Sequence, residues 1–111
     1  MTDCFVLESI FQKHFQKNIK IHLGEKVLRT GKFILFAPKE YYLVFCIDTN
    51  GRKKYLEIPL PFLFTEQKEK ITFDYSSNIL ADDITLNLKI TEYQKQYKSK
   101  YLNNKLVFHF S

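Results

Sequence analysis

Histidine and cysteine are the residue types of this chain that could bind a metal or act as nucleophiles. The three histidines, His14, His22 and His109, lack the spacing of metal ligands, and Cys4 and Cys46 form no Cys-x-x-Cys pair. A site assembled by folding from Cys46, His22 and His109 is one interpretation, and histidines with structural roles are the preferred one. We therefore expect no metal site and no cofactor.

The acidic residues, serines and glycines match no catalytic motif. Asp82 and Asp83 form the one adjacent acidic pair. Adjacent side chains of a strand point to opposite faces, which is poor geometry for shared acid/base catalysis. The three glycines stand at expected turns and form no phosphate-binding loop. The sequence thus predicts a non-catalytic binding domain, not an enzyme.

Basic and aromatic residues carry the remaining functional signal. The formal net charge is +5, which permits an acidic partner such as nucleic acid. Single-stranded nucleic acid is typically held by a positive groove with stacking aromatic side chains on a β platform. The lead hypothesis is therefore single-strand binding by a basic and aromatic β surface. Its expected phosphate contacts are Arg52, Lys53, Lys54, Lys95 and Lys98, and its expected stacking residues are Tyr55 and Tyr42.

A second hypothesis uses the same features for protein contacts, in a subunit or adaptor of a larger assembly or in a homo-oligomer. Aromatic side chains are enriched in the cores of protein interfaces. An edge at Pro59 and Pro61, or the terminal strand 105–110, could extend the sheet of another chain. Binding to single-stranded DNA that is lost as salt rises would favour the first hypothesis. An oligomer that is insensitive to salt would favour the second.

A hairpin over residues 41–58 has to position both tyrosines. Asn50-Gly51 between two β-rich runs predicts a two-residue type I′ turn, because both residues tolerate a positive φ. One face of this ribbon is then apolar, and the other is aromatic with charges at its tip. The expected cross-strand partners are Thr49 with Arg52, Asp48 with Lys53, Cys46 with Tyr55, Phe45 with Leu56, and Leu43 with Ile58.

Hydrophobic periodicity predicts the other elements. Leu7, Ile10 and Phe11 recur at helical spacing near the N-terminus, and a capping box at Thr91 predicts a second helix near 92–102. Residues 26–29 are expected to begin a strand that Gly31 interrupts with a bulge or a turn. Further strands are expected at 18–23, 32–37, 71–75, 84–90 and 105–110.

These elements predict an α+β fold of mainly antiparallel β structure. About seven or eight short strands, with a helix near each end of the chain, would form a small barrel or a two-sheet sandwich. The length of 111 residues predicts a single domain, 1–111.

The N-terminal segment and the cysteines predict where the protein works. Two cysteines provide no disulfide framework, so free thiols in a reducing, intracellular compartment are expected. The N-terminus lacks the basic start of a secretory signal. The longest apolar run, 41–47, is shorter than the roughly 20 residues that span a bilayer, so no membrane partner is expected.

Overall fold

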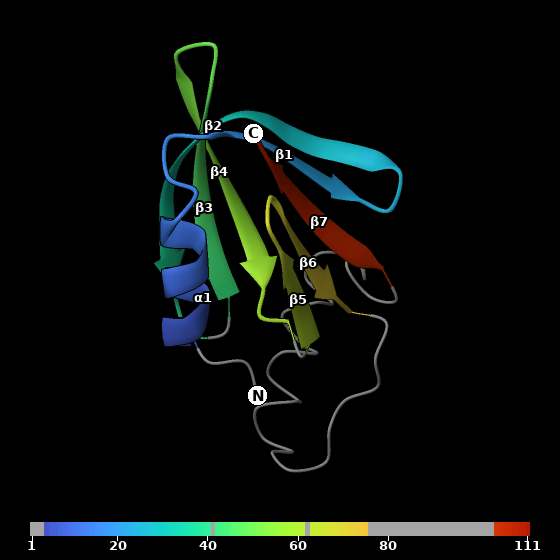
Figure 1. Cartoon of the computed structure of the whole chain (residues 1–111). Coiled ribbons are helices and arrows are strands. Elements are labelled where there is room, and N and C mark those ends of the chain that lie inside the picture. The colour runs from blue at the N-terminus through green and yellow to red at the C-terminus, as the bar shows by residue number, and fades with distance from the viewer. Residues whose placement is uncertain (1–3, 41, 62, 76–103) are drawn as a thin grey trace.

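The computed structural model describes residues 4–40, 42–61, 63–75 and 104–111 (Figure 1). The predicted strand 84–90 and the predicted helix near 92–102, with Lys95 and Lys98, lie outside these residues. The described elements are α1 (Cys4–Gln12), β1 (Asn18–Leu23), β2 (Lys26–Pro38), β3 (Tyr42–Thr49), β4 (Arg52–Pro59), β5 (Leu63–Gln67), β6 (Lys70–Asp74) and β7 (Lys105–Phe110). Within the described residues, no helix is long and apolar enough to cross a membrane.

The strands form one seven-stranded antiparallel sheet in the order β4-β3-β2-β1-β7-β6-β5. The predicted fold class, mainly antiparallel β with an N-terminal helix, is thus confirmed. The end strands β4 and β5 are joined by residues 60–62 alone, a link that spans at most about 14 Å. The sheet therefore has to curl, and the described pairings leave it open between β4 and β5.

Proline sets the edge of the sheet at β4, as predicted. Pro59 ends this strand, because proline donates no hydrogen bond to a neighbouring strand. The hydroxyl of Tyr75, just after β6, donates a hydrogen bond to the carbonyl of Pro59 and so ties the two ends of the curled sheet together. The prediction that the terminal strand forms an edge is wrong, because β7 pairs with β1 on one side and with β6 on the other.

The predicted hairpin is confirmed in turn and register. Asn50 and Gly51 have φ angles of 55° and 83°, as a type I′ turn requires. Every expected cross-strand pair is present, from Thr49 with Arg52 to Leu43 with Ile58.

Two other strands differ from expectation. β2 is continuous through Gly31, where a side chain would collide with the carbonyl oxygen of Asp48. The prediction of an interruption there is wrong: glycine permits a close approach between strands. β5 was not predicted, because Leu63, Thr65 and Gln67 are exposed and the strand lacks a clear alternating pattern.

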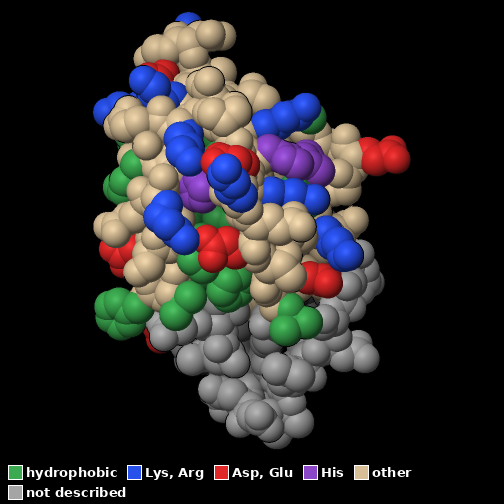
Figure 2. Space-filling model, viewed as in Figure 1, with side chains coloured by type: hydrophobic (Ala, Val, Ile, Leu, Met, Phe, Trp, Pro, Cys, Tyr) green, Lys and Arg blue, Asp and Glu red, His purple; other side chains and the backbone are tan. Residues whose placement is uncertain are grey.

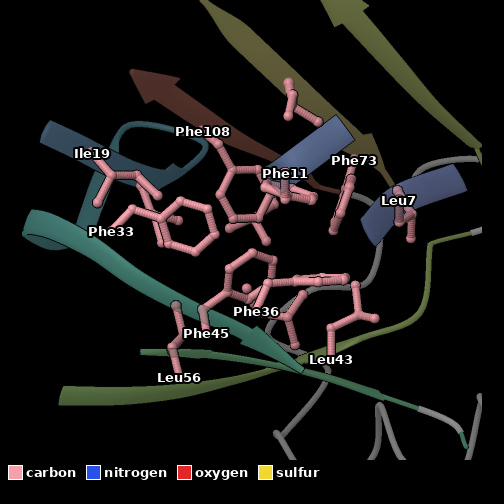
Figure 3. Packing of buried hydrophobic residues seen from close by; sticks show 14 of the residues in the cluster. Leu7, Phe11, Ile19, Phe33, Phe36, Leu43, Phe45, Leu56, Phe73 and Phe108 are labelled. Atoms are coloured by element: carbon pink, nitrogen blue, oxygen red, sulfur yellow. The ribbon is translucent and has the colours of Figure 1, made fainter. Parts of the chain in front are cut away.

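The core is an aromatic cluster built around Phe11, which is fully buried on α1 (Figure 3). The centroid of its ring lies 5.0 to 6.2 Å from the centroids of six other phenylalanine rings. These are Phe33 and Phe36 of β2, Phe45 of β3, Phe73 of β6, and Phe108 and Phe110 of β7. Five of the six contacts are edge-to-face, an arrangement that aromatic quadrupoles favour. One helical side chain thus holds both halves of the curled sheet.

Replacing Phe11 with alanine tests this role. We expect Phe11→Ala to lower the free energy of unfolding by about 3–5 kcal/mol, because it leaves a cavity among six rings. Phe5 lies on the same helix with 81% of its side chain exposed, and Phe5→Ala should change stability by less than about 1 kcal/mol. Chemical denaturation of both variants measures the difference, and equal losses would contradict the central position of Phe11.

Candidate nucleic-acid interface

The face of the sheet opposite α1, called the outer face below, carries the candidate site. Strand alternation places side chains there. In β1, Ile19, Ile21 and Leu23 are buried against the core, so Lys20 and His22 point outward. The pairing registers extend this outer face across β2, β3, β4, β6 and β7, with register shifts on both sides of β2, and within the described residues no helix covers the outer face.

Basic side chains form a row across the outer face, called the basic row: Lys53 of β4, Lys32 of β2, Lys20 of β1, His109 of β7 and Lys70 of β6. The pairing registers align Lys53, Asp48 and Lys32 across three strands, and Lys20, His109 and Lys70 across the next three. Neighbouring strands are about 4.8 Å apart, so the row extends for about 24 Å along the sheet. Figure 2 shows histidines with Lys and Arg side chains beside them on the face in view.

One carboxylate interrupts the basic row. Asp48 lies between Lys53 and Lys32 in the register. Its Oδ1 accepts a hydrogen bond of 2.8 Å from the backbone N–H of Gly51, so this carboxylate also stabilises the hairpin turn. With four lysines and one aspartate, the row keeps an excess of positive charge.

An apolar strip lies beside the basic row on the outer face. Tyr55, Cys46 and Leu35 are aligned across β4, β3 and β2. Tyr55 is 60% exposed and Leu35 is 44% exposed, whereas the free thiol of Cys46 between them is buried. Tyr42, half-buried, follows on the same face of β3. The structure thus brings the two predicted stacking residues to one face, and Tyr55 is open to solvent.

The predicted basic triplet at the hairpin tip is divided between two faces. Lys53 is opposite Asp48 and points outward with Tyr55. Arg52 and Lys54 have the other orientation in the strand. All three are exposed, but Lys53 alone joins the basic row.

Lys20, Lys32, Lys70 and His109 were not assigned to the site from the sequence. Their outward orientation follows from strand alternation in β1, β2, β6 and β7. Their proximity does not, since β7 joins β1 from the far end of the chain. No local pattern in the sequence predicts the pairing of β1 with β7.

Two histidines meet on the outer face between β1 and β7. The Nε2 atoms of His22 and His109 are 2.8 Å apart, and Nδ1 of His22 is 2.9 Å from the carbonyl oxygen of Gly24. A carbonyl accepts only, so Nδ1 of His22 is the donor and its Nε2 accepts the hydrogen bond from Nε2–H of His109. Burial lowers the pKa of His109, and the nearby His22, Lys70 and Lys20 lower it further.

In the alternative site from Cys46, His22 and His109, the two histidines therefore meet, but Cys46 is not with them. Cys46 is on β3, which β2 separates from β1. No group of three or more His, Cys, Asp or Glu side chains arranged for a metal ion occurs in the described part of the chain. A shallow hollow of about 350 Å³ lies beside His109, with Lys20, Thr30, His109 and Ser111 in its lining.

His14 has a structural position, as the preferred interpretation expects. It lies in the turn after α1, which ends at Gln12. Its ring is buried and stacks on Phe110, with centroids 4.0 Å apart and an angle of 8° between the rings. Nζ of Lys17 lies 3.2 Å from Nδ1 of His14 and 3.3 Å from the Glu69 carboxylate. Burial lowers the pKa of His14, and the charge of Lys17 adds to that shift.

Comparisons with protein-family models, curated proteins and solved structures gave no match. The functional argument therefore depends on the chemistry of the outer face. That chemistry combines a positive row for an anionic chain with an adjacent strip that includes an exposed aromatic ring.

The lowered pKa of His14 predicts a pH dependence of stability. Below its ordinary pKa of 6.5, His14 binds more protons in the unfolded chain than in the folded one. The free energy of unfolding should therefore be largest above pH 6.5 and fall as the pH decreases through the folded pKa. His14→Phe retains a ring against Phe110 and should make this dependence smaller. Denaturation curves between pH 7.5 and 5 measure it, and an unchanged slope in the variant would refute the assignment.

Proposed function

We propose that this protein is a non-catalytic domain that binds single-stranded nucleic acid on the outer face of its sheet. The observation that supports this most strongly is that the basic row and the exposed ring of Tyr55 share this face. Positive charge and a stacking platform are the two requirements for single-strand binding without sequence preference.

In this proposal the basic row contacts the phosphates. Lys53, Lys32, Lys20 and Lys70 lie on four different strands, so the sheet, and not a flexible loop, sets their spacing. Their charges are part of the net charge of +5, which favours approach of a polyanion.

The bases in this proposal stack on Tyr55, with Tyr42 on the same face but four residues farther along the hairpin, opposite Pro59. Cys46, the cross-strand partner of Tyr55, is a residue type usually found in cores, which would suggest that this face is covered. The exposure of Tyr55 argues against such a cover. Among the described residues, none buries the ring of Tyr55, since 60% of the residue remains accessible. Leu35 supplies an apolar contact two strands away.

The other predicted phosphate contacts do not belong to the basic row. Arg52 and Lys54 lie on the opposite face of the ribbon, and they add charge at its tip without joining the row. Lys95 and Lys98 belong to the residues outside the described structure and remain predicted phosphate contacts.

A protein interface is the second candidate function. The exposed side chains of Leu35 and Tyr55 favour it, because large apolar side chains are enriched where proteins meet. They lie near β4, which ends the sheet and offers a strand edge to another chain. Binding driven by this strip would depend little on salt, whereas binding to phosphates weakens steeply as salt rises.

Lys53 and Lys54 provide a matched pair for testing the basic row. We expect Lys53→Gln to weaken binding to an oligothymidylate and to reduce the slope of log K against log salt by about 0.7, because one phosphate contact is lost. Lys54→Gln removes the same charge from the next residue, on the other face, and should leave the slope nearly unchanged. Fluorescence anisotropy at several salt concentrations measures both. Equal effects of the two variants would argue against the outer face.

Tyr55→Ala tests the stacking platform. The affinity for the oligothymidylate should fall by about 1–3 kcal/mol with no change in salt slope, because a stacking contact is removed and no charge is lost. Tyr55→Phe keeps an aromatic face and should bind nearly as the wild type does. The melting temperature of Tyr55→Ala should change little, since the side chain is largely exposed. Unchanged affinity together with reduced self-association would instead support the protein interface.

A further inference from the structure

We propose that His22 and His109 form a binding site for a divalent late first-row transition metal, Cu²⁺ or Ni²⁺. The two Nε2 atoms are 2.8 Å apart on the outer face. Two imidazoles in adjacent positions of a tetragonal or octahedral ion have nitrogens about 2.9 Å apart, given metal–nitrogen bonds of about 2.0–2.1 Å. A tetrahedral ion such as Zn²⁺ needs about 3.3 Å. The observed nitrogen spacing therefore matches adjacent positions on Cu²⁺ or Ni²⁺. The two rings, with centroids 4.9 Å apart and 14° between their planes, have to turn so that both lone pairs point at the ion.

The hydrogen bonding of His22 supports the same site. Its Nδ1–H donates to the carbonyl oxygen of Gly24 at 2.9 Å, which leaves the lone pair on Nε2. Histidines that bind metals characteristically donate their other ring N–H to a backbone carbonyl or carboxylate, and this contact orients the ring. His22 thus has the tautomer and the second-side hydrogen bond that a metal-binding histidine needs.

His109 becomes a ligand by a change of tautomer. Its Nε2–H now donates to His22, and metal binding requires that this proton move to Nδ1 through solvent. No proton is gained or lost overall. The metal ion takes the place of this hydrogen bond and lies to one side of the line between the two Nε2 atoms, because each metal–nitrogen bond is about 2.0–2.1 Å long.

The sheet limits the entropy that such a site would lose on binding. His22 and His109 lie on two central strands joined by a continuous antiparallel pairing from Ile19 with Phe110 to Leu23 with Leu106. The hollow of about 350 Å³ beside His109 leaves room for water ligands at the positions that the protein does not fill. Two ligands and open positions make this a site that can take a further ligand.

Nearby charges affect the affinity in both directions. Lys20 of β1 and Lys70 of β6 flank His109 and repel a cation, and Lys105 and Asp74 are opposite each other in the strand register farther along β7 and β6. On the β2 side, Val27 faces His22 and carries no charge.

Titration of the untagged chain with Ni²⁺ tests the site. Isothermal calorimetry near pH 7.5 should show one saturable Ni²⁺ site per chain. His22→Gln and His109→Gln should each weaken it by more than about tenfold, because each removes a ligand, a larger change than the loss of an outer hydrogen bond. His14→Phe removes the buried histidine and should leave the affinity unchanged. Lys20→Gln should raise the affinity, since it removes a repelling charge.

Spectroscopy and pH locate the bound ion. Substoichiometric Cu²⁺ should broaden the NMR signals of β1 and β7 around residues 20–24 and 107–109, while the circular dichroism of both glutamine variants stays that of the folded wild type. Ni²⁺ binding should weaken as the pH falls from 7.5 to 5.5, because protonated imidazole does not bind metals. Absence of saturable binding, broadening centred elsewhere, or unchanged affinity in folded His22→Gln and His109→Gln would overturn the proposal.

Discussion

The packing of Phe11 against six phenylalanine rings is the constraint on which the rest of this structure depends. Those rings come from strands in both halves of the sheet, so one helical side chain requires the sheet to curl around it. The short link 60–62 and the hydrogen bond from Tyr75 to Pro59 hold the ends of the curl together. With the apolar side chains of each strand directed to this centre, the alternate side chains have to face solvent.

The outer face acquires its chemistry from that requirement. Lys20, Lys32 and Lys70 point outward because a neighbour in sequence is a core residue, Lys53 points outward opposite Asp48, and the pairing of the strands sets the order of the charges. His109 lies within this row, and His22 lies next to it. The two proposals are therefore physically connected: a metal ion bound by His22 and His109 would add positive charge where the phosphates of a single strand are proposed to lie.

Local features of the sequence predicted a large part of this fold, and contacts between distant segments limited the rest. Asn50-Gly51 determines both a turn and the register of its two strands, so the position of Tyr55 opposite Cys46 was predictable. The exposed strand β5 has no alternating pattern to reveal it. His22 and His109 are 87 positions apart in the chain, and the pairing of β1 with β7 that joins them depends on the whole sheet. For the same reason, strand alternation could predict which side chains of the basic row point outward, but it could not predict that these side chains lie in one row.

Lysine footprinting tests most directly the claim that a curled sheet presents one basic, aromatic face to a single strand. The folded protein would be acetylated under limiting reagent with and without an oligothymidylate, and each modified lysine would be quantified by mass spectrometry. The account predicts that the nucleic acid protects Lys20, Lys32, Lys53 and Lys70, and that Lys54 and Lys13, which point away from the outer face, react as before. Protection of Lys54 and Lys13 to the same extent, or no protection in the basic row, would contradict it.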